Sequence, residues 1–144
     1  MESLSDVFRQ DHERLDASLK AARQSAQSGA AGAARAAFAE FRSGIERHMA
    51  VEEAVLFPAY EARHGADNPL TSTLRKGHGD LKVFFSEMGE SLAEDDAEEF
   101  LALADTVGQI LLHHDRKEEE ELYPVVAQWL ADGGREAIAG LTEA

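Results

Sequence analysis

An internal repeat constrains this chain more than any other feature. Residues 48–58 read HMAVEEAVLFP and residues 114–124 read HDRKEEEELYP, so both place a glutamate four residues after a histidine and end in leucine, an aromatic residue and proline. The offset is 66 residues, and it also aligns FRQDHERL at 8–15 with LRKGHGDL at 74–81. The repeat therefore predicts two similar halves related by a pseudo-two-fold axis.

The composition between these motifs is that of helices. Alanine, leucine, glutamate and arginine dominate, and there are only three prolines. Turn signals fall at 28–32, 64–69 and 92–99, and they divide the chain into four long segments. Asn68, before a proline, and an aspartate at 95 or 96 look like helix N-caps. This pattern predicts an all-α, up-down-up-down four-helix bundle.

We expect residues 1–144 to form a single domain, with a short C-terminal helix in the tail from 134. Apolar residues make up 44% of the chain, enough for a real core at this length. The chain has no cysteine, which excludes disulfides, thiolate metal sites and thiol catalysis. The N-terminus does not resemble a signal peptide, and no apolar run approaches the ~18 residues that a membrane helix needs. A net charge of −14 argues against nucleic acid and anionic lipid as partners, and we expect a cytoplasmic protein.

Each segment carries residues spaced by three or four, the period of one helix face. These stripes are Leu4, Phe8, His12, Leu15, Leu19 and Ala22; Phe38, Phe41, Ile45, His48, Glu52 and Leu56; Leu74, His78, Leu81, Phe85, Met88 and Leu92; and Val107, Leu111, His114, Glu118, Leu122, Val125 and Trp129. Four histidines and two glutamates thus lie on faces that should point into the core. An unpaired buried carboxylate costs several kcal/mol or more, so such groups are paired or bound to metal.

The turns place these six residues at one height in the bundle. Antiparallel helices bring two residues level when both lie equally far from the turn between them. His12 and His48 are centred on residue 30, Glu52 and His78 on residue 65, and His78 and His114 on residue 96, and each centre falls inside a predicted turn. Each of the first two histidines is about 27 Å along its helix from the first turn. The six side chains should therefore converge.

Histidine and carboxylate together favour iron, manganese or zinc over calcium. Six ligands are too many for one tetrahedral zinc, but they suit two metals bridged by two carboxylates. The predicted metal ligands are His12, His48, Glu52, His78, His114 and Glu118. No catalytic residue stands out in the sequence.

Several neighbouring residues are interpreted differently. His113 is turned about 100° from the next residue along its helix and should face a flank. His64 falls in a predicted loop, where solvent exposure is expected. Glu53 and Glu119 lie one position off the stripe, as surface groups or hydrogen-bond partners of a ligand histidine. For the two tyrosines, Tyr60 and Tyr123, core packing is favoured over a phenolate role. The prolines are expected to kink their helices, with the preceding aromatic covering the site.

The pattern resembles the hemerythrin-like family, also called the His-His-Glu cation-binding domain, from about Asp6 to Trp129. The resemblance implies a four-helix bundle with a non-haem di-iron centre that meets oxygen. It also implies that the first two predicted histidines bind one iron, the last two bind the other, and both glutamates bridge them.

The family's oxygen carriers have a fifth histidine where this chain has Lys82, and Asp16 holds the equivalent place in the first half. Their last carboxylate is an aspartate five residues after its histidine, whereas Glu118 here follows after four. The resemblance therefore favours the iron-sensing and bacterial members over reversible oxygen carriage. The function expected is binding or sensing of oxygen, iron, nitric oxide or peroxide. A catalase-like or peroxidase-like di-iron enzyme is the alternative, and a histidine phosphotransfer module centred on His78 is a weaker one.

Overall fold

A computed structural model describes residues 2–142, and every regular element in that range is a helix. The elements in order are α1 (Leu4–Gln27), α2 (Ala31–Val51), η1 (Glu52–Leu56), α3 (Phe57–His64), α4 (Pro69–Ala93), α5 (Ala97–Lys117), η2 (Glu118–Leu122), α6 (Tyr123–Val126), η3 (Ala131–Gly134) and α7 (Arg135–Thr142). The segments η1 and η2 are π-helical, and η3 is a 3₁₀ turn.

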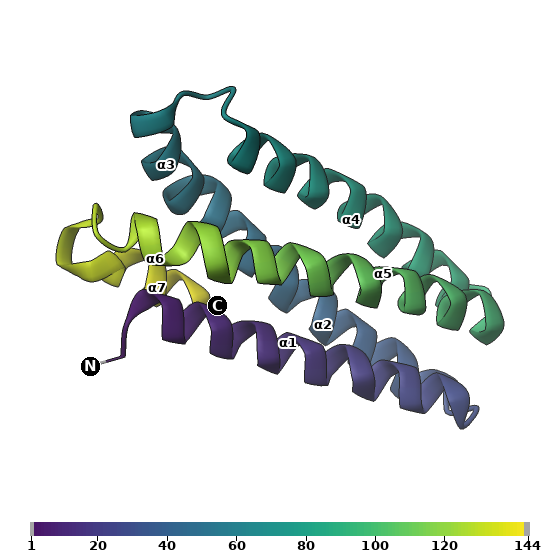
Figure 1. Ribbon diagram of the computed structural model, residues 1–144. Coiled ribbons are helices and arrows are strands. Elements are labelled where there is room, and N and C mark those ends of the chain that lie inside the picture. The colour runs from purple at the N-terminus through teal and green to yellow at the C-terminus, as the bar shows by residue number, and fades with distance from the viewer. Residues whose placement is uncertain (1, 143–144) are drawn as a thin grey trace.

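The helices form the predicted up-down-up-down bundle (Figure 1). Around the bundle α1 packs against α2 and α5, while α4 packs against α2 and α5. The predicted C-terminal helix is present as α7, which contacts α1 and α2 near the end where the chain begins. This end is therefore closed by a short element outside the repeat.

The three predicted turns separate the long helices as expected. Asn68 caps α4, because its side chain accepts a hydrogen bond from the backbone N–H of Thr71, and Pro69 occupies the first turn. Asp96 caps α5 by accepting from the N–H of Glu99. Asp95 instead takes a positive φ of 57° in the turn before the cap. Local sequence thus fixes where these helices begin.

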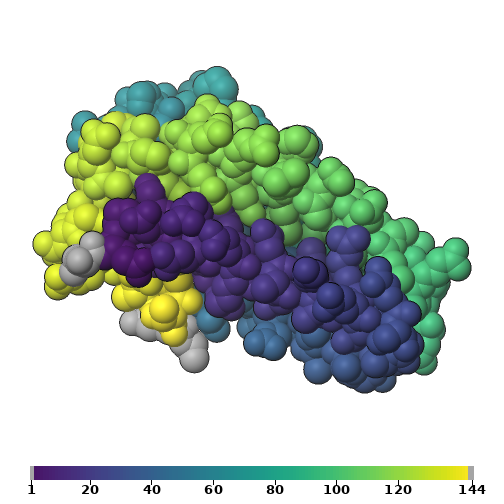
Figure 2. All heavy atoms as spheres, turned by 60° about the horizontal axis from the view of Figure 1, so that its bottom comes forward, coloured from purple at the N-terminus to yellow at the C-terminus, as the bar shows by residue number. Residues whose placement is uncertain are grey.

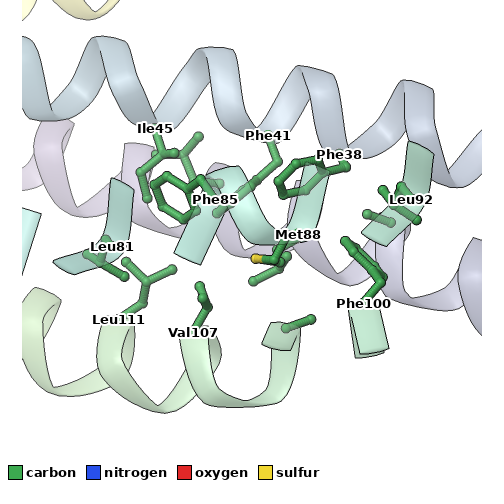
Figure 3. Packing of buried hydrophobic residues seen from close by; sticks show 14 of the residues in the cluster. Phe38, Phe41, Ile45, Leu81, Phe85, Met88, Leu92, Phe100, Val107 and Leu111 are labelled. Carbon is green, nitrogen blue, oxygen red and sulfur yellow. The ribbon is translucent and has the colours of Figure 1, made fainter. Parts of the chain in front are cut away.

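The apolar core divides into two clusters along the bundle. The larger, near the α1–α2 and α4–α5 turns, includes Phe41, Phe85 and Phe100, and its packing is drawn in Figure 3. The smaller, at the other end, includes Phe8 and Leu74. The predicted polar residues of each stripe lie between these clusters. The bundle therefore has a polar layer enclosed by apolar packing on both sides.

Both repeated motifs form π-helical turns. In η1 the N–H of Phe57 bonds to the carbonyl of Glu52, five residues back, and the next residue is Pro58. Proline has no N–H, and in an α-helix its ring strikes the carbonyl four residues earlier, so a wider turn accommodates it. The proline was predicted to act as a kink, and a π turn is the form that its effect takes.

The second π turn repeats this geometry and shifts the buried face of the last helix. In η2 the N–H of Tyr123 bonds to the carbonyl of Glu118. Beyond it the buried residues are Tyr123 and Val126, while Val125 and Trp129 are only partly buried. The predicted stripe was wrong by one position here, because the extra residue of the π turn advances the helix face.

Candidate metal centre

All six predicted ligands lie in the polar layer, and they come from the four long helices and the π turns that continue two of them. They are His12, His48, Glu52, His78, His114 and Glu118. Both glutamates have no exposed surface, and the histidine side chains are at most 8% exposed. Burial this deep is unusual for carboxylates and requires compensating partners.

The histidines form two pairs, one from each half of the repeat. His12 and His48, the first pair, have ring centroids 4.6 Å apart. His78 and His114, the second pair, have ring centroids 5.0 Å apart. Ligand atoms of the first pair and both glutamates lie within 4.8 Å of one another, and the same holds for the second pair and both glutamates. The layer thus contains two four-ligand groups that share their carboxylates.

Glu52 directs one oxygen to each pair. Its Oε2 lies 3.3 Å from Nε2 of His48, and its Oε1 lies 3.1 Å from Nε2 of His78. Glu52 Oε1 and His78 Nε2 are buried and have no hydrogen-bond partner among residues 2–142. Leaving such groups unsatisfied costs free energy, so a cation between them would supply the missing interaction. The histidine nitrogens and carboxylate oxygens of this layer therefore fit a bound metal ion.

Glu118 has the same arrangement in the other half. Its Oε1 lies 3.2 Å from Nε2 of His12, and its Oε2 lies 3.2 Å from Nε2 of His114. Each carboxylate thus divides its two oxygens between the two histidine pairs. This is the geometry that a bridging ligand needs.

Outer carboxylates hold three of the histidine rings in this orientation. Nδ1 of His12 donates to Glu119 Oε2 at 2.6 Å, and Nδ1 of His78 donates to Glu53 Oε2 at 2.7 Å. A carboxylate of this kind fixes the tautomer of a metal-binding imidazole and leaves Nε2 facing inward. For Glu53 and Glu119 the sequence left two roles open, a surface position or a hydrogen bond to a ligand histidine. The structure shows the hydrogen bond in both cases.

Asp11 is a third outer carboxylate, and it was not among the site residues predicted from the sequence. Its Oδ2 accepts from Nδ1 of His48 at 2.7 Å. The residue reaches across from α1 to α2, so its partner is not on its own helix. The available signals in the sequence are its position directly before His12 and the glycine, Gly77, at the equivalent place in the other half.

Tyr123 lies at the centre of the layer, whereas the sequence favoured simple core packing for this residue. Its hydroxyl donates to Glu52 Oε2 at 2.5 Å and lies 3.0 Å from Glu118 Oε1. It is also 3.1 Å from Nε2 of His12 and 3.2 Å from Nε2 of His48. The hydroxyl therefore touches all four residues of the first group.

Asp115 also belongs to the centre. One carboxylate oxygen lies 3.3 Å from Nε2 of His12, the nitrogen that faces inward, and only 15% of the side chain is exposed. It lines a small interior cavity, about 10 Å³ in volume, together with ligands of both pairs. That volume is close to the smallest that holds a water molecule.

Inside this layer, neighbouring acidic and basic side chains shift one another's pKa toward the charged forms. Burial lowers the pKa of His12, but its hydrogen bond with Glu118 and the charge of Asp115 outweigh burial and raise the pKa to about 9. Burial raises the pKa of Glu118, yet its interactions with His114, His12 and His78 hold this pKa well below the ordinary value. Burial and the negative charges of both glutamates raise the pKa of Tyr123 well above its usual range, so its hydroxyl stays protonated.

Three other residues considered as site candidates, His64, His113 and Lys82, lie outside this layer. His64 and His113 are exposed, as expected. Lys82 has its ammonium 3.5 Å from Glu53, so it contacts an outer carboxylate rather than a ligand.

The alternative of a histidine phosphotransfer module centred on His78 does not fit the structure. His78 is 2% exposed, and phosphotransfer needs an accessible histidine.

Comparison with known families agrees with this geometry. The family model described as the hemerythrin HHE cation-binding domain matches residues 3–126. The chain belongs to this hemerythrin family. Searches of curated proteins and of solved structures find no match. Family membership and the buried His/Glu cluster together indicate a metal-binding site in this hemerythrin domain. Within residues 2–142, none of the helices combines the length and the apolar character needed to cross a membrane.

Proposed function

We propose that this hemerythrin domain holds two iron ions and that the centre binds or senses oxygen or a related small species such as nitric oxide or peroxide. The first pair would hold one iron, the second pair the other, and Glu52 and Glu118 would bridge them. The observation that carries this proposal is the division of each buried carboxylate between the two histidine pairs. Histidine with carboxylate is a donor set that suits iron.

The chain's own side chains prepare the centre for this role. The outer carboxylates keep Nε2 of three imidazoles directed inward. The apolar clusters above and below exclude bulk water, which strengthens electrostatic interactions inside. Tyr123 keeps a proton at the middle of the layer, where its hydroxyl is a hydrogen-bond donor. When bound, a pair of ferrous ions would supply two electrons, which none of these side chains provides.

Lys82 favours a sensor or a reactive centre over a reversible carrier. It stands one turn after His78, but its ammonium pairs with Glu53 outside the ligand layer. A protonated amine has no lone pair for a metal, so Lys82 adds no ligand to the second pair. The second iron would therefore keep an exchangeable position open to a small molecule.

The proposal is tested by the absorption spectrum of protein loaded with ferrous iron under anaerobic conditions and then exposed to air. We expect an almost colourless ferrous protein that gains absorption in air, and a further change when azide is added. Glu52→Ala and Glu118→Ala should lose this response, whereas Glu120→Ala, at an exposed position of the same acidic run, should retain it. An air response that persists in both buried variants, or is missing from the wild type, would show that the bridged centre is not formed.

A further inference from the structure

The two halves of the repeat differ at four positions beside the centre. In each pair one member carries a carboxyl or hydroxyl group, and the residue at the equivalent position carries neither. The pairs related by the 66-residue offset are Asp11 with Gly77, Asp16 with Lys82, Asp115 with Met49, and Tyr123 with Phe57. Although Tyr123 and Asp115 belong to the second half of the sequence, their side chains reach His12 of the first pair. Asp11 bonds to His48, and Asp16 lines a surface pocket with His12, so the acidic or hydroxyl member of every pair lies beside the first histidine pair.

Asp115 makes the largest difference, because it places a carboxyl oxygen next to a ligand atom. Its carboxylate is 3.3 Å from Nε2 of His12, about as close as Glu118 Oε1 at 3.2 Å. The equivalent residue in the other half, Met49, is a buried thioether with no charge. A carboxylate this close to a bound cation attracts it strongly in a site shielded from bulk water, so the difference between the two halves is large for a metal ion.

The second pair has less carboxylate support. Gly77 stands where Asp11 supports the first pair, and a Cβ added to it would lie 2.8 Å from Nδ1 of His114, too close for any side chain without displacement. His78 has Glu53 on its Nδ1, but this carboxylate also faces the ammonium of Lys82.

The apolar neighbour of the second pair differs as well. The ring of Phe57 packs at 5.2 Å from the ring of His78 and offers no oxygen. Tyr123, its counterpart in the repeat, places a hydroxyl 3.1 Å from Nε2 of His12. The first pair therefore has more oxygen atoms available to a metal, and more acidic groups around it, than the second.

We propose that Asp115 is an additional metal-binding carboxylate of the first pair and makes that position the tighter of two unequal metal positions. The proposal rests on the two-metal function argued above, and it adds an order of loading to it. The metal at the second pair is the one that exchanges more readily. Removing a single carboxylate that supports a metal site typically lowers metal affinity 10–100-fold.

Asp115 is also placed between the centre and the surface. A surface pocket of about 380 Å³ between α1 and α5 is lined by His12 and by five acidic residues, Asp115 among them, against two arginines. Figure 2 shows α1 in purple running beside α5 in green. The same aspartate and His12 line the interior cavity. A cation that arrives through this largely acidic pocket meets the first pair before the second.

The test is a calorimetric titration of metal-free protein with Fe²⁺ under anaerobic conditions, using a competing chelator to resolve tight binding. For wild type we expect two events of one iron each, with the first at least tenfold tighter. Asp115→Met, which copies the residue of the other half, and Asp115→Asn should each weaken the tighter event at least tenfold and leave the weaker one within about threefold. Far-UV circular dichroism checks that each variant folds.

Two further variants assign the events. Asp105→Asn removes the same charge from an exposed position on α5 and should change neither event. Glu53→Gln removes the carboxylate behind His78 and should weaken only the looser event. If two irons bind but both Asp115 variants leave the tighter event unchanged, or weaken the looser one instead, the inference is wrong and the two-metal function stands. A wild type that binds one iron or none overturns the two-metal function itself.

Discussion

Replacing Tyr123 with phenylalanine removes one oxygen from the centre of the polar layer. The phenyl ring fits, because the tyrosine ring already occupies this place, and the other half of the repeat has the buried Phe57 at the equivalent position. The hydroxyl donates to Glu52 at 2.5 Å, and that carboxylate is completely buried. A hydrogen bond to a charged group contributes about 1.5–3 kcal/mol, and its loss here leaves this buried carboxylate oxygen with only the longer 3.3 Å contact to His48 Nε2. We therefore expect metal-free Tyr123→Phe to be about 1.5–3 kcal/mol less stable than wild type.

The effect should shrink when metal is bound, since a cation then satisfies the same carboxylate oxygen. The assay is urea unfolding followed by circular dichroism, with and without saturating metal. Tyr60→Phe, which removes a hydroxyl from a partly buried tyrosine outside the layer, is the matched control and should stay within about 0.5 kcal/mol of wild type. Equal midpoints for metal-free wild type and Tyr123→Phe would refute the role given to this hydroxyl.

Three further predictions concern the metal, the second pair and a surface ion pair. Metal that binds only the folded chain should stabilise it by about 2.7 kcal/mol per site at a free concentration of 100 times Kd, and His114→Ala should lose part of this gain in thermal melts; identical melts with and without metal would contradict a core site. Lys82→His should place an imidazole one turn after His78, fill the open position of the second iron and slow oxidation of the ferrous protein in stopped-flow mixing with oxygen; equal rates for both proteins would mean that the position is already filled. Arg75 donates two hydrogen bonds to Glu61, at 2.9 and 2.8 Å, which hold the pKa of that carboxyl below its ordinary value. Stability from this pair is therefore present above the ordinary pKa of 4.5 and disappears as pH falls through the depressed value, so Arg75→Gln should cost at most about 1 kcal/mol at pH 7 and less at pH 3 in urea unfolding; an equal cost at both pH values would contradict the ion-pair explanation.

The bundle and the six-residue layer were predictable because both follow from helix periodicity. Residues such as Phe41 and Phe85 repeat every three or four positions and are buried as expected. Turn signals such as Asn68–Pro69 fix where each helix begins, so heights along antiparallel helices can be counted from the sequence. Two regularities, period and turn position, were enough to bring His12 and Glu118 together.

Tyr123 could not be placed by the same reasoning. It follows Glu118 by five residues, which in an α-helix is about 140° around the axis and away from the ligand face. In the π turn five residues rotate about as far as four do in an α-helix, so the tyrosine comes onto the same face as the glutamate. Proline after each aromatic was the available signal, but it indicates a disturbance of the helix without giving its form.

Asp11 and Asp115 were missed for a different reason. Each precedes or follows a ligand histidine by one residue and so lies off the helix stripe. Each acts on a histidine of another helix, His48 and His12 respectively. Such contacts depend on the distance and rotation between packed helices, which periodicity within one helix does not specify. Comparing the two halves of the repeat is what singles them out, because Gly77 and Met49 stand at the equivalent positions.

The central claim is that two buried glutamates bridge two metals. Its most direct test is the iron-to-protein ratio of anaerobically loaded protein after removal of loosely bound metal, measured for wild type, Glu52→Ala and Glu118→Ala. The bridged arrangement predicts two irons per chain in the wild type and a sharp fall in both variants, since each glutamate has an oxygen directed to each histidine pair. One iron per chain in fully loaded wild type, or an unchanged ratio of two in both variants, would contradict it.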